Sequence, residues 1–121
     1  MLAVALCLAS GASWARADDQ VARGLALYES KCFVCHAVDS NRIGPMHKDV
    51  FGRRAGSVPN YAYSDALRRS AIVWNADTLE RWLENPEQLI PGQAMGVSVS
   101  QSEERKLLIA YLKSISRAGS R

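Results

Sequence analysis

Apolar residues recur at helical spacing near both ends of the chain, whereas polar and turn-forming residues fill much of its middle. From residue 19 to residue 30, Val21, Leu25 and Tyr28 fall at i, i+4 and i+7, which predicts an amphipathic helix that buries these side chains. Gly24 lies in the same face, where it costs about 1 kcal/mol relative to alanine. We therefore expect another helix to cross closely at Gly24.

The C-terminal end predicts a second helix, which follows residue 100. Ser100 and Glu103 have the spacing of a capping box at its start. Its apolar stripe consists of Leu108, Tyr111, Leu112 and Ile115. We expect this helix to cross the first one, with Gly24 against Tyr111.

Shorter helices are predicted between these two. Asn75 is a suitable N-cap for one of them, and Asn85 followed by Pro86 is a stop signal. The apolar face of this helix comprises Leu79, Trp82 and Leu83. A weaker signal for a short helix begins near Ser64. No periodicity is sustained over residues 37–63, so a long irregular segment is expected there.

Two cysteines and a histidine form the most specific chemical pattern, in the segment KCFVCHAVDS. Two residues separate Cys32 from Cys35, and His36 follows at once. A zinc site needs four ligands, but the other cysteine and histidine of the chain are Cys7 and His47, so carboxylates would have to complete it. A dithiol redox site needs a βαβ context, whereas the flanks here indicate helix and loop.

A covalently attached haem accounts for all three side chains. Cys32 and Cys35 would add to the two vinyl groups as thioethers, and His36 would supply the proximal nitrogen to the iron. The haem also explains the irregular segment 37–63, which is unusually long for a compact domain. Its large apolar face would replace the side chains that this segment lacks. The sequence thus predicts one covalent haem c.

The segment PGQAM, which ends at Met95, is the best candidate for the other side of the iron. It displays a methionine on a Pro/Gly turn, 59 residues after His36 and before the last helix. A lone methionine more often fills a core than binds a metal, because its thioether is a common packing group. Here the turn offers poor packing and the proximal half-site is present, which favours Met95 as the distal ligand.

The first 17 residues predict a signal peptide. They form an apolar run too short to span a bilayer and end in Ala15-Arg16-Ala17, the small-x-small pattern of a cleavage site. The alternative is an uncleaved helix. Removal of residues 1–17 leaves one domain, residues 18–121, whose two cysteines belong to the motif, so no disulfide is expected even in an oxidising compartment.

Several short motifs occur in the order seen in class I c-type cytochromes. The chain resembles most closely the small soluble carriers of mitochondria and proteobacteria, over nearly all of the mature segment. The matching stretches are CFVCH (32–36), GP (44–45), FGR (51–53), YAYS (61–64), VW (73–74), LENP (83–86) and PGQAM (91–95). The resemblance implies an all-α cytochrome c fold, with three to four helices and long loops wrapped around one covalently attached haem.

The resemblance also implies roles for residues around the haem. The carbonyl of Pro45 would orient His36, and Tyr63 and Trp74 would bond a haem propionate. Arg53 and Tyr61 would lie near that propionate. These roles suit the side chains, because aromatic residues with a donor tip combine apolar area with a hydrogen bond, and arginine offsets a buried anion. The alternative for each aromatic residue is plain core packing.

Three departures from the family pattern are informative. Trp82 and Leu67 stand where many relatives have tyrosine and asparagine near the methionine ligand, so the site is expected to be drier. Glu87 and Gln88 replace lysines that the mitochondrial carriers use in docking. His47 occupies a position that is commonly apolar, where an exposed histidine is expected and a second ligand role is the alternative.

Charge says little about partners. The chain carries +3, or +2 after loss of Arg16 with the signal peptide. Some basic side chains form either a basic rim or an ordinary solvated face, namely Lys31, Arg53, Arg54, Arg68 and Arg69. The chain has no aromatic-interleaved basic patch of the kind that binds nucleic acid.

The predicted function is electron transfer by a periplasmic, monomeric carrier that is not an enzyme. Its iron would have His36 and Met95 as ligands, and its donor and acceptor would be redox proteins, such as membrane or periplasmic oxidoreductases. No stable membrane insertion is expected after signal cleavage. The alternatives are a haem peroxidase or gas-binding protein with an open distal face, and a haem subunit of a larger redox complex.

Overall fold

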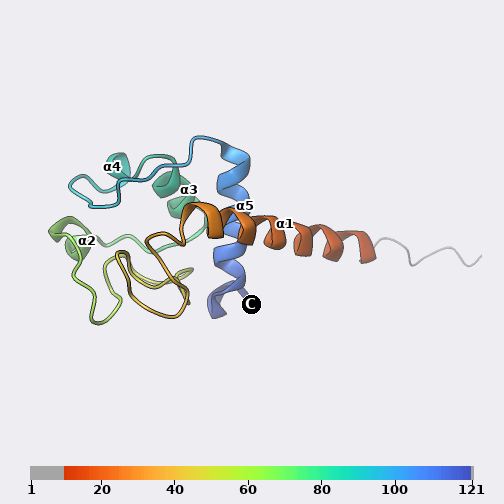
Figure 1. Ribbon diagram of the computed structural model, residues 1–121, viewed down its shortest axis with the longest axis horizontal. Helices are drawn as coiled ribbons and strands as arrows, with labels where there is room; N and C mark the ends of the chain where they lie inside the picture. The colour runs from red at the N-terminus through yellow and green to blue at the C-terminus, as the bar shows by residue number, and fades with distance from the viewer. Residues whose placement is uncertain (1–9, 121) are drawn as a thin grey trace, which may run out of the picture.

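Two long helices cross, and the shorter helices and loops lie to one side of the crossing (Figure 1). The computed structural model describes residues 10–120, so residues 1–9 of the expected signal peptide and Arg121 lie outside it. The elements are α1 (Ser10–Lys31), α2 (Asp65–Arg69), α3 (Ala76–Glu84), α4 (Pro86–Leu89), α5 (Ser102–Ser114) and the 3₁₀ helix η1 (Arg117–Ser120). The described residues contain no strand, only an isolated bridge between Arg54 and Val73. The all-α fold is therefore confirmed.

The predicted crossing of the terminal helices is present, and Gly24 is its point of closest approach. A Cβ atom added to Gly24 would lie 2.1 Å from the carbonyl oxygen of Leu107 and 2.9 Å from the Cβ of Tyr111. One turn further along α1, Tyr28 is 2% exposed, and its ring centroid lies 4.9 Å from that of Tyr111. Glycine is needed here because the backbones of α1 and α5 approach too closely for a side chain.

One residue that we predicted to lie on the buried face of α1 is exposed. Leu25 is 39% exposed, so its prediction as a core residue is wrong. The buried edge runs instead through Val21, Gly24 and Tyr28. Neighbouring helical residues are turned by about 100° from each other, and α5 packs on the Gly24 side, which leaves Leu25 at the margin of the contact.

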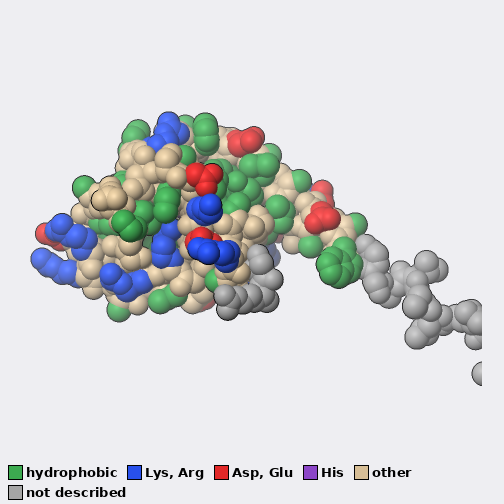
Figure 2. Space-filling model, turned by 90° about the horizontal axis from the view of Figure 1, so that it is seen from below, with side chains coloured by type: hydrophobic (Ala, Val, Ile, Leu, Met, Phe, Trp, Pro, Cys, Tyr) green, Lys and Arg blue, Asp and Glu red, His purple; other side chains and the backbone are tan. Residues whose placement is uncertain are grey.

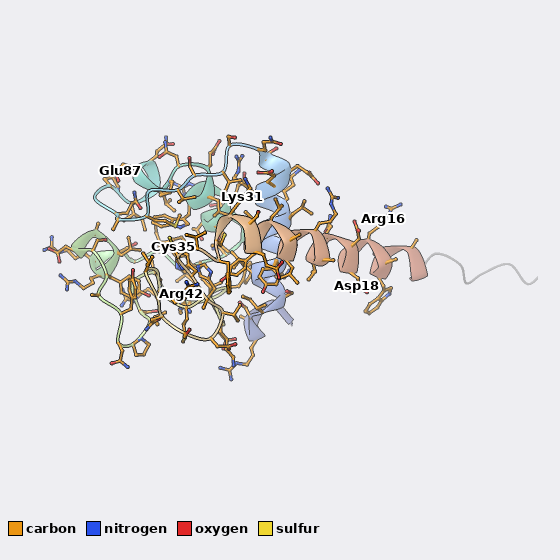
Figure 3. The ribbon with its side chains drawn as sticks, in the orientation of Figure 1. Arg16, Asp18, Lys31, Cys35, Arg42 and Glu87 are labelled. Carbon is orange, nitrogen blue, oxygen red and sulfur yellow. The ribbon has the colours of Figure 1, made fainter. Side chains whose placement is uncertain are left out.

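Helix α1 begins earlier than the apolar spacing predicted. It runs without a break through the expected cleavage site after Ala17. Residues 12–20 are all exposed, and this part of the helix, which carries Arg16 and Asp18, projects away from the rest of the fold (Figure 3). The core therefore does not use these residues. Within residues 10–120, no helix is long and apolar enough to cross a membrane.

Asparagine side chains organise α3 and α4. Asn75 caps α3 in a reciprocal box with Thr78, as its position predicted. Asn85 ends α3 and also begins α4, because its side chain accepts a hydrogen bond from the Gln88 amide at 3.1 Å. Pro86 is tolerated as the first residue of α4, where its missing N–H would have no helical partner. The predicted stop signal is thus also a start signal, which is why the sequence did not predict α4.

Helix α5 begins differently from the prediction. Its N-cap is Gln101 and makes no side-chain capping bond, so the predicted box between Ser100 and Glu103 is wrong. Arg105 occupies this region instead: its Nη1 donates to the carbonyls of Val99 and Ser100, at 2.8 and 2.9 Å. Ser100 lies one residue ahead of the N-cap, so its hydroxyl is not at the capping position.

The irregular segment 37–63 is fixed by backbone hydrogen bonds to residues 72–74. The amide of Gly52 donates to the Trp74 carbonyl at 2.7 Å, and the amide of Ala55 donates to the Ile72 carbonyl at 2.8 Å. The segment also buries Val50, Ala55 and Val58. It therefore contributes more to the core than its lack of periodicity suggested.

Replacement of Gly24 by alanine tests the crossing. The added Cβ would overlap the Leu107 carbonyl, so we expect a loss of about 1–3 kcal/mol in the free energy of unfolding, measured by denaturant titration. The control is Ala26→Gly on the exposed face of α1. This reverse exchange should lower the free energy of unfolding by about 1 kcal/mol, because glycine is the poorer helix former and no close contact is involved. A Gly24→Ala variant more stable than the wild type would show that the helices do not approach closely.

Candidate functional site

A cavity of about 430 Å³ lies between the segment 37–63, helices α3 and α5, and the segment that carries Met95. Its wall includes core residues from all these parts of the chain and from α2: Val50, Leu67, Leu79, Leu83, Val99, Leu108 and Leu112. An apolar, concave wall with a few polar groups is typical of a cofactor site.

Every site residue predicted from the sequence lines this cavity. These are Cys32, Cys35, His36, Pro45, Arg53, Tyr61, Tyr63, Trp74, Trp82 and Met95. They come from the turn after α1, the segment 37–63, the segment between α2 and α3, α3 itself and the turn after α4. Residues far apart in the sequence thus converge on one space.

The two cysteines lie in a tight turn that continues from the end of α1. The amide of Cys32 donates to the Tyr28 carbonyl at 2.8 Å, and the amide of His36 donates to the Cys32 carbonyl at 2.9 Å. Both thiols are free, so the turn presents them separately to the cavity. Burial raises the pKa of the Cys32 thiol to about 11. The thiol is therefore protonated at neutral pH.

The ring of His36 is buried and held from several directions. Its Nδ1 donates a hydrogen bond to the Pro45 carbonyl at 2.7 Å, which leaves Nε2 to bind a metal. Gly44 lies against the same ring, because a Cβ atom there would be 2.2 Å from Cε1. Burial lowers the pKa of His36, although the bond to Pro45 opposes this effect. The imidazole is thus neutral, which is the metal-binding form.

His47 is not exposed, and that expectation is wrong. Its ring stacks on the ring of His36, with centroids 4.0 Å apart and planes inclined by 21°. Its Nδ1 shares a hydrogen bond with the Tyr28 hydroxyl at 3.0 Å. Burial, with His36 and Arg53 nearby, holds the pKa of His47 well below its ordinary value. The side chain points inward because the hydrogen-bonded turn at Val50 folds the segment over the cavity.

Polar tips of aromatic residues meet a guanidinium at another part of the wall. The Tyr61 hydroxyl donates to the Ile43 carbonyl at 2.6 Å, whereas the Tyr63 hydroxyl accepts from the Val58 amide at 3.2 Å. Arg53 donates to the carbonyls of Met46 and Lys48, each at 3.0 Å. Trp74 is buried, and its ring lies 5.2 Å from that of Trp82.

The basic residues do not form a continuous rim. Arg53 faces the cavity wall, Arg68 and Arg69 both pair with Asp65, and Lys31 pairs with Glu104 at 3.2 Å. On the face shown in Figure 2, Lys and Arg side chains occupy several separate places, with acidic side chains among them. The solvated-face interpretation fits Arg54, Arg68 and Arg69, which are exposed, whereas Lys31 and Arg53 line the cavity.

The turn that carries Met95 is fixed by Glu87. One carboxylate oxygen accepts from the Gly92 amide at 2.8 Å, and the other accepts from the Gln93 side chain at 3.2 Å. Gln93 in turn accepts from the Met95 amide at 2.6 Å. Glu87, labelled in Figure 3, thus anchors the turn to α4. Glu87, which stands where the mitochondrial carriers have a docking lysine, therefore stabilises the turn before Met95 in this chain.

Two arginines that support the site were not predicted. Arg42 donates to the Phe33 carbonyl at 2.6 Å and stacks on the Phe33 ring, which fixes the turn between the cysteines. Arg105 is 6% exposed and donates to Glu80 at 2.5 Å, which ties α5 to α3 beside the cavity. These partners are distant in the sequence, so no local pattern announces them.

Comparisons with known proteins agree with this site. Residues 21–116 match the cytochrome c family. The chain is 41% identical to cytochrome c of Gibberella zeae over 101 residues, which cover 80% of this chain and 95% of that protein. It is 34% identical to cytochrome c2 of Blastochloris viridis over 119 residues, which cover 94% of this chain and 91% of that protein.

A solved structure gives the same result. The fold superposes on cytochrome cH from Methylobacterium extorquens with a TM-score of 0.74 and 35% sequence identity, over 78% of this chain and 97% of that one. The chain therefore belongs to the cytochrome c family, the haem electron carriers that bind one covalent haem c.

Proposed function

We propose that the protein is a periplasmic electron carrier whose haem c is attached through Cys32 and Cys35 and has His36 and Met95 as axial ligands. The observation that carries the proposal is the convergence of all ten predicted residues on one apolar cavity. The proposal is finer than family membership, because it assigns each role to a residue of this chain.

The proximal half of the site supports this assignment. The turn after α1 presents two separate thiols and the His36 ring to the same space. The bond from Nδ1 to Pro45 fixes the tautomer, so that the lone pair of Nε2 is available to the iron. A neutral, buried imidazole needs no deprotonation to bind.

The distal half of the site favours Met95 over His47. The ring of His47 stacks on His36, so it lies beside the proximal ligand and not across the cavity from it. Met95 approaches from the turn after α4, which Glu87 holds in place. A thioether on such a fixed turn can bind the iron with little loss of conformational freedom.

The polar part of the wall suits the haem propionates. Tyr63 already accepts a hydrogen bond from Val58, so its own hydroxyl proton is free to donate to a carboxylate. Tyr61 already donates to Ile43, so it can only accept and does not serve a carboxylate in this position. The guanidinium of Arg53 stabilises an anion through its charge. We therefore assign the donor role to Tyr63 and Trp74, with Arg53 nearby.

These residues suit a carrier. When bound, haem c supplies a one-electron couple between ferrous and ferric iron. His36 and Met95 sit on hydrogen-bonded turns, so they keep the same positions in both oxidation states and little rearranges during transfer. The thioether favours the ferrous form and raises the reduction potential.

Export accounts for the exposed start of α1. Residues 12–20 bury no side chain, so cleavage after Ala17 leaves the crossing at Gly24 intact. We infer that residues 1–17 direct the chain to the periplasm, where the haem is attached and the mature monomer exchanges electrons with redox proteins.

Replacement of Met95 by alanine tests the carrier function. We expect the sulfur-to-iron charge-transfer band of the ferric protein to disappear and carbon monoxide to bind the ferrous protein. We expect the potential to fall by on the order of 0.1 V, part of the ~0.8 V range that axial ligands set. Absorption spectra and a redox titration measure these effects.

The matched control is Met46→Ala, which removes a thioether whose residue does not line the cavity. This variant should keep the sulfur-to-iron charge-transfer band, and its ferrous form should not bind carbon monoxide. A band lost in the Met46 variant but kept in the Met95 variant would refute the assignment. Rapid carbon monoxide binding by the unaltered protein would contradict the carrier function and would favour a peroxidase or a gas-binding protein.

Replacement of both Cys32 and Cys35 by alanine tests the contribution of the haem to the core. The apolar wall would then surround a group that nothing holds covalently. We expect the haem-free chain to lose its cooperative thermal transition, followed by circular dichroism. A cooperative transition at the melting temperature of the wild type would show that the chain folds stably without the haem.

A further inference from the structure

The segment that lies behind His36 contains a second imidazole with no role in the proposed ligand set. His47 is stacked almost parallel to His36, at a centroid separation of 4.0 Å. The contact is face to face, whereas the bond from His36 to Pro45 is made at the ring edge. The two contacts therefore restrain different motions of the same ligand.

A hydrogen bond at one edge atom lets a ring rock about that atom. A flat group on the ring face resists this rocking, because any change of plane brings atoms of the two rings into overlap. Gly44 lies against the same ring and narrows the space further. Pro45 thus fixes the direction of Nδ1, and His47 restrains the plane of the imidazole.

His47 is itself held in place from two sides. Its amide donates to the Ala37 carbonyl at 3.1 Å, and its carbonyl accepts from the Val50 amide at 2.9 Å. Its Nδ1 is bonded to the hydroxyl of Tyr28, whose ring is in an edge arrangement with the imidazole at 5.6 Å. Neither the backbone nor the ring of His47 can move without breaking these bonds.

Tyr28 connects this contact to the crossing of α1 and α5. It is 2% exposed and packs on Tyr111, four residues along α1 from the crossing at Gly24. A continuous path of contacts therefore runs from the α1–α5 crossing through Tyr28 and His47 to His36. An apolar side chain at position 47 would lack the hydrogen bond that locks this path.

We propose that His47 is a positioning residue that sets the plane of the His36 imidazole, and that Tyr28 locks His47 in that position. The inference rests on the proposed role of His36 as the proximal ligand. In ferric low-spin haem with a histidine and a methionine ligand, the plane of the imidazole and the orientation of the methionine sulfur together determine which porphyrin positions receive unpaired spin. A change in the imidazole plane therefore changes the chemical shifts of the haem methyl groups.

The test compares three variants of the ferric holoprotein by proton nuclear magnetic resonance. His47→Leu removes both the flat ring and the hydrogen bond, so we expect a changed order or spacing of the haem methyl shifts. Tyr28→Phe removes only the hydroxyl, and a smaller change in the same direction is expected. His47→Phe restores a flat ring, so its methyl pattern should lie closer to the wild type than that of His47→Leu.

Ile109→Ala in α5 is the stability control, because Ile109 packs on the core without lining the cavity. It should lower the melting temperature and leave the methyl shifts unchanged. The inference is overturned if His47→Leu behaves in the same way, or if Ile109→Ala alters the shifts as much. Should His47→Leu fail to mature, Tyr28→Phe decides: an unchanged methyl pattern in that variant overturns the locking role.

These results are distinguishable from failure of the proposed function. A wild-type protein whose iron is not bound by His36 would overturn the proposed function and this inference together, whereas a wild type without the sulfur-to-iron band would overturn the proposed function alone. A wild type with the band, combined with unaltered methyl shifts in all three variants, would overturn the inference alone.

Discussion

The fold depends on one constraint: its own side chains do not close its core. Protein interiors are normally packed as densely as organic crystals, whereas helices α3 and α5, the segment 37–63 and the segment that carries Met95 line one apolar cavity of about 430 Å³. The chain belongs to a family that binds one covalent haem c, and the large apolar ring of that haem supplies packing partners for such a wall.

Several contacts hold the residues around the cavity in place. The crossing at Gly24 leaves no room for a side chain, and Tyr28 beside it bonds to His47, which stacks on His36. On the other side, Glu87 fixes the turn that carries Met95, and Arg105 joins α5 to α3. In the proposed assignment, these contacts would keep both ligands in place when the iron changes charge, which is what an electron carrier requires.

Local patterns predicted the parts of this structure that depend on neighbouring residues. The spacing around Gly24 and Tyr111 predicted the crossing, and Asn75 predicted the start of α3, because helix faces and caps are decided within a few residues. The Cys-x-x-Cys-His pattern and PGQAM named residues that do line one cavity. The predicted Ser100 cap is wrong because the helix begins one residue later, with Gln101 as its N-cap.

The other errors depend on tertiary contacts. Leu25 is exposed because the exact side from which α5 approaches is a tertiary property. His47 was expected on the surface because polar residues usually lie there, whereas Tyr28, 19 residues away, offers it a buried partner. Glu87 and Arg42 act through backbone groups that become neighbours only after the chain folds. No local pattern in the sequence predicts such contacts.

The central claim is that a haem held between His36 and Met95 completes this core. It is tested most directly by the proton spectrum of the unaltered ferrous protein. A methionine bound to iron lies over the porphyrin, whose ring current moves its methyl resonance upfield of all other protein signals. The account predicts one such resonance, assigned to Met95 by selective labelling. A ferrous spectrum without it, or with the resonance of Met46 in its place, would contradict the account.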